Sequence, residues 1–126
     1  MDMSLISRRF ADTTVVFPEG RIDHATAEQF KAALAPHLAP CAAGRDGLVI
    51  DMTGVEYISS VGLRVLMLAS KQAKAQACAL AVCGLQPVVR EIFEISRFNL
   101  VLQVFPTLRE ALAALSTEAL AAFEAA

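Results

Sequence analysis

"DMTGVEYISSVGLRVL", residues 51 to 66, is the stretch that decides how this chain folds. It begins inside the short apolar run Leu48–Met52, which is typical of a strand buried on both faces. The segment "TGVEYI" predicts a turn, and a helix with apolar residues three and four positions apart is expected from Val61 to Ala75. Ser59 and Ser60 lie directly before that helix. Four roles are open for these two hydroxyls: helix caps, nucleophiles, phosphate ligands or a phosphorylation site.

The rest of the chain continues the alternation of strands and helices. The runs "LISRRF" (5–10) and "TTVVFPEGRI" (13–22) predict a β-hairpin whose second strand holds Pro18 at an edge or a bulge. Further buried strands are expected at 78–85 and 100–105. Helices are expected to begin near Thr26, Pro87 and Thr107, because each Thr has a capping-box spacing and Pro87 suits a first helical turn. This order predicts one α/β domain with helices packed on a largely parallel sheet.

Three finer expectations concern the helices. Pro36 is expected to end or kink the first helix near residue 35, because proline removes a helical hydrogen bond. The third helix is expected to turn Val88, Ile92 and Ile95 toward the core. The last helix is expected to run on from residue 108 past residue 123 and to pack against its own domain, with an intermolecular contact through Leu120 and Phe123 as the open alternative.

Composition narrows the classes of function. The chain has 126 residues, a net charge of −2 and 56% hydrophobic residues. Its Lys and Arg are scattered, which argues against nucleic acid as a partner, since neutralising phosphates needs clustered cations. No segment approaches the ~18 apolar residues that a membrane-spanning helix needs, and no export signal is visible. A cytoplasmic protein without membrane insertion is expected, and its oligomeric state is left open.

Catalytic and metal-binding signatures are absent from the sequence. His24 and His37 lie in no metal-ligand spacing, and there is no Walker-type loop, GxGxxG or GxSxG motif. The sequence therefore predicts no cofactor, no metal and no enzyme activity, with a serine nucleophile served by His24 as the open alternative. The three cysteines, Cys41, Cys78 and Cys83, are expected to be small buried hydrophobes.

Three blocks of sequence carry a resemblance to a known family. They are "RIDHATAEQF", "LVIDMTGVEYISSVGLRVL" and "PVVREIFEISRFNLVLQVFPTLREAL". In this order and spacing they resemble the STAS domain of bacterial anti-sigma factor antagonists. The resemblance implies a mixed sheet of roughly four or five strands flanked by about four helices. It implies a single domain over residues 1–126, with a core at about 5–115 and a C-terminal helix extension at 116–126.

The resemblance also assigns the two serines. The family's switch loop reads Asp-Ser-Ser/Thr-Gly-Leu and is phosphorylated on the serine that follows the Asp. Aligning its Gly-Leu pair with Gly62 and Leu63 makes Ser60 the phosphorylation site, with Ser59 in place of the Asp and Val61 in place of the second hydroxyl. The expected partner-binding residues are Asp23, Thr26, Ser59, Ser60, Val61, Gly62 and Arg64.

Structural roles remain open beside these functional ones. Ser59 fits a cap or loop residue, Thr26 a cap, and Asp23 an Asx-type turn that its carboxylate stabilises. Ser60 is expected to cap the helix as a second role. Gly62 is expected to let a partner's backbone approach the serine, because glycine has no Cβ.

The function that the resemblance implies is a protein–protein switch. The unmodified chain would bind an anti-sigma factor that is also a GHKL-type serine kinase. Phosphorylation of Ser60 would abolish that binding, and a serine phosphatase would restore it. The alternative is a standalone STAS subunit or scaffold of a lipid-transport ATPase or sensory complex, without a phosphate cycle.

Overall fold

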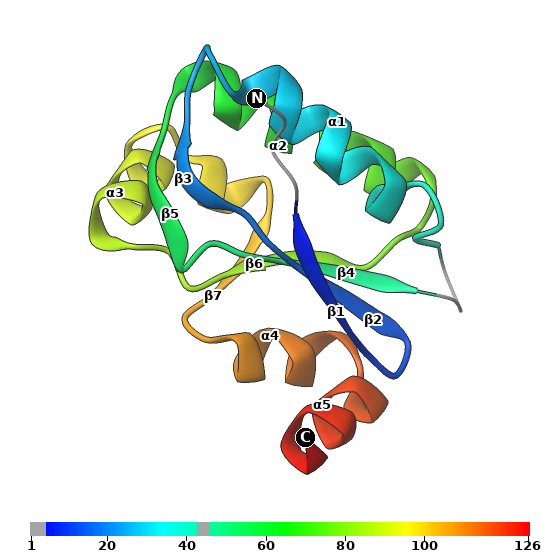
Figure 1. The fold of residues 1–126 in the computed structure, drawn as a ribbon. Coiled ribbons are helices and arrows are strands. Elements are labelled where there is room, and N and C mark those ends of the chain that lie inside the picture. Colours follow the sequence, from blue (N-terminus) through cyan, green and yellow to red (C-terminus); the bar gives the residue numbers. More distant parts are fainter. Residues whose placement is uncertain (1–4, 43–45) are drawn as a thin grey trace.

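The computed structural model describes residues 5–42 and 46–126 (Figure 1). The strands are β1 (Ile6–Phe10), β2 (Thr13–Phe17), β3 (Glu19–Ile22), β4 (Gly47–Asp51), β5 (Gly54–Ile58), β6 (Leu80–Cys83) and β7 (Gln103–Phe105). The helices are α1 (Ala27–Leu38), α2 (Ser60–Ala75), α3 (Pro87–Ile95), α4 (Leu108–Leu115) and α5 (Thr117–Ala125), with a 3₁₀ turn, η1 (Phe98–Leu100).

The main sheet has five strands in the order β1-β2-β4-β6-β7. β1 is antiparallel to β2 and the other neighbours are parallel, so the predicted mixed sheet is confirmed. Figure 1 shows α1, α2 and α3 on one side of this sheet and α4 and α5 on the other. Alternate residues of one strand serve the two sides: Leu48 and Ile50 pack in the larger core, and Val49 packs in the smaller one.

A second sheet of two strands, β3 and β5, corrects two predictions. The segment "TGVEYI" is not only a turn, because Gly54–Ile58 forms a strand parallel to Glu19–Ile22. The run 13–22 is not one strand either. It is interrupted at Pro18, whose missing N–H cannot continue a ladder, and the chain passes there from the main sheet to the small one. The carboxyl ends of β3 and β5 therefore lie side by side.

Two helix predictions are wrong in part. Pro36 does not end α1, which continues to Leu38. Pro36 is exposed, while Leu34 and Leu38 on the opposite side are buried, so core packing outweighs the hydrogen bond that proline removes. In α3 Val89 and Phe93 are buried. Ile92 is partly buried against the core, as predicted, whereas Val88 is 54% exposed and Ile95 is 77% exposed.

The C-terminal segment is two helices instead of one. Ser116 has an extended backbone, and its Oγ accepts a hydrogen bond from the N–H of Ala119 at 3.1 Å, which caps α5. The same hydroxyl donates to Asp12 at 2.7 Å. Phe123 meets Phe10 of β1 edge to face, with ring centroids 5.4 Å apart. The prediction that this segment packs against its own domain is therefore confirmed.

The predicted burial is confirmed for Cys41 and Cys83, and Cys78 is partly buried against the core. Cys83 is free and buried, and burial together with the Asp51 carboxylate raises its pKa to about 12. Cys41 and Cys78 instead form a disulfide. Sequence reasoning missed this pair because it joins the end of α1 to the end of α2, where Gln76 also donates to the carbonyl of Cys41 at 2.7 Å. Disulfides persist in oxidising surroundings, so the state of this pair depends on where the protein works.

Candidate partner-binding and phosphorylation site

The candidate site forms where β3 and β5 end side by side. Ile22 faces Ile58 in the parallel register, and the N–H of Ser59 donates to the carbonyl of Ile22 at 2.8 Å. This pairing brings the turn before α1 next to the beginning of α2. Residues 20–26 and 57–64, which include the expected partner-binding residues, are therefore neighbours in space.

The two serines have different roles in the structure. Ser59 is the N-cap of α2, with an extended backbone and an Oγ that accepts from the N–H of Gly62 at 3.3 Å. Ser60 is the first residue of the helix and is exposed. None of the hydrogen bonds found among the described residues uses its side chain. The cap is therefore Ser59 alone, and the expected second role of Ser60 as a cap is wrong.

The electrostatic setting of Ser60 favours a negative charge. The first turn of α2, which the structure describes in full, contains no acidic residue. Backbone N–H groups at a helix N-terminus have no intrahelical partner, and the helix dipole is positive there. The site can therefore accept an anion on the Ser60 hydroxyl at little cost to the fold.

Asp23 stabilises the turn that faces the serines. Its Oδ1 accepts from the N–H of Ala25 at 3.0 Å, as the Asx-turn interpretation predicts. This hydrogen bond, the largest of several effects, holds the pKa of Asp23 below its ordinary value of 3.8. The stability that it contributes is present above pH 3.8 and is lost as the pH falls through the lower folded-state pKa.

Thr26 lies at the N-cap position of α1 but does not cap the helix with its side chain. It is the N-cap residue of α1, but its side chain makes no capping hydrogen bond within the described helix. The Thr26 hydroxyl instead donates to the carbonyl of Arg21 at 2.8 Å and accepts from the N–H of Asp23 at 3.0 Å. The capping box predicted for Thr26 and Gln29 is therefore wrong. The Thr26 hydroxyl instead stabilises the turn that precedes α1.

Arg21 and Tyr57 lie at the candidate site, although neither was among the partner-binding residues named from the sequence. The Arg21 guanidinium lies over the Tyr57 ring, 4.5 Å from its centroid, and the Nε of Arg21 is 3.8 Å from the Oδ2 of Asp23. Arg21 is 58% exposed and presents a cation beside the turn. The missed signal was the strand character of "GVEYI", which pairs Tyr57 with Arg21 across the small sheet.

Packing inside the domain requires glycine at position 62. It is buried, and a Cβ there would lie 2.7 Å from Cγ1 of Ile58 and 2.8 Å from Cγ2 of Ile22. Its missing side chain lets α2 pack on the ends of β3 and β5, so the expectation of an open approach for a partner's backbone is corrected. Val61, 44% exposed, and Arg64 are on the outer side of the helix.

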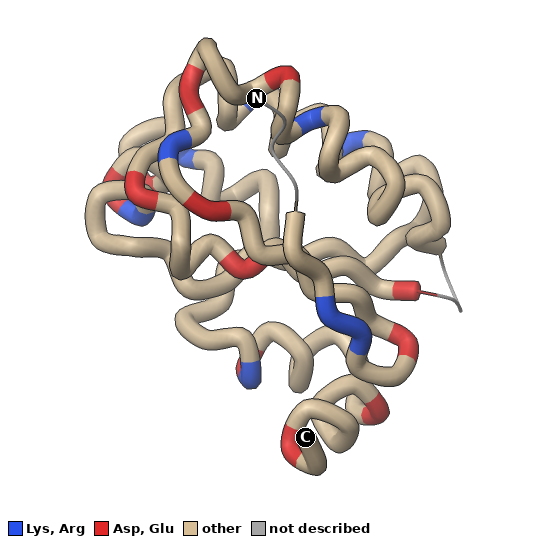
Figure 2. The backbone as a smooth tube through the Cα atoms, viewed as in Figure 1, with Lys and Arg blue, Asp and Glu red and all other residues tan. Residues whose placement is uncertain are grey.

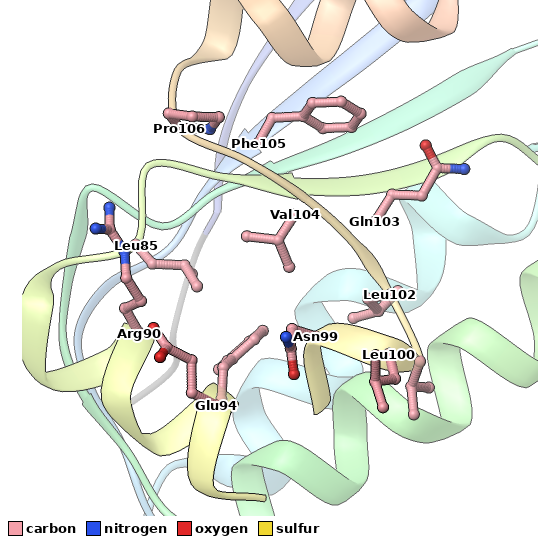
Figure 3. A pocket seen from close by; sticks show the side chains of 12 residues that line it. Leu85, Arg90, Glu94, Asn99, Leu100, Leu102, Gln103, Val104, Phe105 and Pro106 are labelled. Atoms are coloured by element: carbon pink, nitrogen blue, oxygen red, sulfur yellow. The ribbon is translucent and has the colours of Figure 1, made fainter. Parts of the chain in front are cut away.

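A groove of about 340 Å³ opens beside Ser60. Its lining residues come from α2 and from the segment after α3: Ser60, Leu63, Arg64, Met67, Ser96, Phe98 and Val101. A larger cavity of about 680 Å³ lies between α3 and β7 and shares Val101 with the groove. Figure 3 shows Arg90 and Glu94 of α3 at this larger cavity, which includes none of the predicted site residues.

Three further features of the described residues concern metals, membranes and charge. No group of His, Cys, Asp and Glu among them is arranged to hold a metal ion. None of the described helices is long and apolar enough to cross a membrane. Figure 2 shows Lys and Arg on several elements of the described chain.

Comparison with known proteins identifies the family. The model of the STAS domain matches residues 5–111. The chain belongs to the STAS domain family. This STAS domain is 43% identical over 98 residues to BtrV of Bordetella bronchiseptica, which carries the provisional name of anti-sigma factor antagonist; the match covers 76% of this chain and 79% of BtrV. It is 31% identical over 107 residues to the anti-sigma-B factor antagonist of Listeria monocytogenes, with 82% of this chain and 90% of that protein covered.

Solved structures agree with the family. The crystal structure of an anti-sigma factor antagonist from Mycobacterium paratuberculosis is similar, with a TM-score of 0.79 and 25% identity, covering 90% of this chain and 94% of that one. The fold and the resemblance to anti-sigma factor antagonists predicted from the sequence are therefore confirmed. The assignment of individual residues to binding or phosphorylation stays a prediction.

Proposed function

We propose that this STAS domain protein is an anti-sigma factor antagonist controlled by phosphorylation of Ser60. The unmodified protein binds an anti-sigma factor that is also a GHKL-type serine kinase, and phosphate on Ser60 ends that binding. A serine phosphatase returns the protein to its binding form. The observation that carries the proposal is the exposed Ser60 hydroxyl, without a hydrogen-bond partner among the described residues, at the first position of α2 and beside the Asp23 turn.

The geometry gives the switch a physical basis. A phosphoserine carries close to two negative charges, and the N-terminus of α2 can accept them without unfolding the domain. Within a complex the same charges would be desolvated against the partner's surface, which costs free energy unless the partner supplies cations. Phosphorylation therefore changes the affinity more than it changes the fold.

Ser59 stands where the family's loop has an acid, and this difference affects how the site meets a phosphate. The family has an acid at this position, and Ser59 supplies a neutral cap that holds the N–H of Gly62. A phosphate on Ser60 consequently meets no carboxylate from the preceding residue.

The direct test of the proposed function is incubation of the protein with ATP and purified anti-sigma factor kinases from the same genome, one at a time. One of them should bind the protein and transfer phosphate to it, and the proposal fails if none does either.

Replacing Asp23 by Asn tests the turn as part of the binding surface. The Asn carbonyl can still accept from the N–H of Ala25, so the melting temperature at neutral pH should stay close to that of the wild type. The charge that faces the partner and Arg21 is removed, and affinity for the kinase should fall by about tenfold. Isothermal titration calorimetry measures this affinity. Glu19→Gln, at the exposed opposite end of β3, is the matched control and should bind like the wild type. An unchanged affinity of Asp23→Asn would remove Asp23 from the site.

A further inference from the structure

The groove beside Ser60 has an apolar interior and a single charge. Of its seven lining residues, Leu63, Met67, Phe98 and Val101 are apolar and Arg64 is the charged one. Arg64 is exposed and takes part in none of the ion pairs found among the described residues. The surface next to the proposed phosphorylation site therefore combines an apolar hollow with a cation that has no ionic partner among the described residues.

The wall opposite α2 packs against α3 and contacts α2. Phe98, 5% exposed, stacks on Phe93 of α3 with ring centroids 5.3 Å apart. Arg97, directly before it, has a left-handed backbone with φ 58°, a conformation that costs free energy for a residue with a side chain. The Ser70 hydroxyl donates to the carbonyl of Val101 at 3.5 Å, which links this wall to α2. These contacts place the groove within the protein's own fold.

We propose that this groove binds an apolar side chain of the anti-sigma factor, with a neighbouring carboxylate of the same protein paired to Arg64. The inference rests on the proposed function, because it names a second contact of the same partner. Ser60 itself lines the groove, so a kinase that brings its active site to the Ser60 hydroxyl must cover the groove as well. The charge complementarity follows from Arg64, and the flexible thioether of Met67 suits a surface that adjusts to an incoming side chain.

This arrangement couples docking to phosphorylation. Arg64 follows Ser60 by four residues, so the two side chains lie on the same side of α2 one turn apart. A phosphate on Ser60 is a strong acceptor for the Arg64 guanidinium. It competes with the partner's carboxylate for that cation, and the phosphorylated protein loses the charged half of the docking site.

Substitutions in the groove test the proposal by isothermal titration with the cognate anti-sigma factor kinase. Val101→Glu places an acid at a side chain that is 40% exposed, and Arg64→Glu reverses the charge at an exposed site. Each should weaken binding at least tenfold while the melting temperature stays close to that of the wild type. Val88→Glu is the matched control, because Val88 is exposed and apolar but lies outside the groove, and it should bind like the wild type.

A second measurement examines Arg64 without the kinase. Phosphoserine can be incorporated at position 60 during expression, both in the otherwise unchanged protein and in the Arg64→Gln variant. Phosphorus NMR should then show a lower second pKa for the phosphate in the protein that keeps Arg64. Full-strength binding by Val101→Glu and Arg64→Glu, or identical phosphate pKa values, would overturn the docking inference while leaving the proposed function intact. Failure of the wild type to bind any anti-sigma factor kinase would overturn both.

Discussion

Ser60→Ala is expected to bind the anti-sigma factor kinase as the wild type does and to accept no phosphate. Alanine removes the hydroxyl that receives the phosphoryl group and adds neither bulk nor charge. The stability should not change measurably, because Ser59 and not Ser60 caps α2. Intact-mass spectrometry after incubation with kinase and ATP, together with titration calorimetry, measures both properties.

Ser60→Asp should remain folded and bind the kinase about tenfold or more weakly, which is about 1.4 kcal/mol or more. An acid at the N-terminus of a helix is favourable for the fold, and the first turn of α2, which is fully described, has no other acid to repel it. The loss should be smaller than that caused by phosphate, since Asp carries one negative charge and phosphoserine close to two.

Ser59→Ala separates the two serines. It should lose about 1 kcal/mol of stability, because the N–H of Gly62 loses its capping acceptor. Phosphate should still appear on Ser60 in this variant. If peptide mass spectrometry finds phosphate on Ser59 alone, or on neither serine in the wild type, the family's acceptor role does not apply to this protein.

Gly62→Val is expected to cost roughly 3 kcal/mol of unfolding free energy. The first added carbon would lie 2.7 Å from Ile58, 2.8 Å from a side-chain carbon of Ile22 and 3.0 Å from the carbonyl of Ile22. Both isoleucines are buried, so neither side chain can move away easily. The same carbonyl accepts the N–H of Ser59, and its displacement would disturb the beginning of α2. Urea denaturation measures the change.

Lys71→Val is the control for Gly62→Val. Lys71 is exposed on the same helix, so this variant carries the cost of a β-branched residue in a helix without the clash, and it should lose less than about 1 kcal/mol. Gly62→Ala should fall between the two, because alanine favours the helix but still places a Cβ against Ile58. Equal stability of the Gly62 and Lys71 variants would mean that the contact with the small sheet does not require glycine.

The sequence by itself determined the features that depend on neighbours along the chain. The apolar run Leu48–Met52 predicted β4, and Pro87 and Thr107 marked the starts of α3 and α4. The order of these elements predicted the layered α/β fold, and the order and spacing of three sequence blocks predicted the family. These signals are local, because hydrogen bonding, periodicity and capping involve residues only a few positions apart.

Only the tertiary structure decided the features that depend on residues far apart in the chain. Residues 54–58 become a strand because β3 lies beside them, and that pairing places Tyr57 under Arg21 and a buried Ile22 against Gly62. It also divides the roles of the serines, since the Ile22 carbonyl holds the N–H of Ser59 and leaves Ser60 facing outward. The packing of α1 on α2 brings Cys41 next to Cys78. The groove likewise requires Val101 to meet α2 across 31 positions of sequence, a separation that no local pattern encodes.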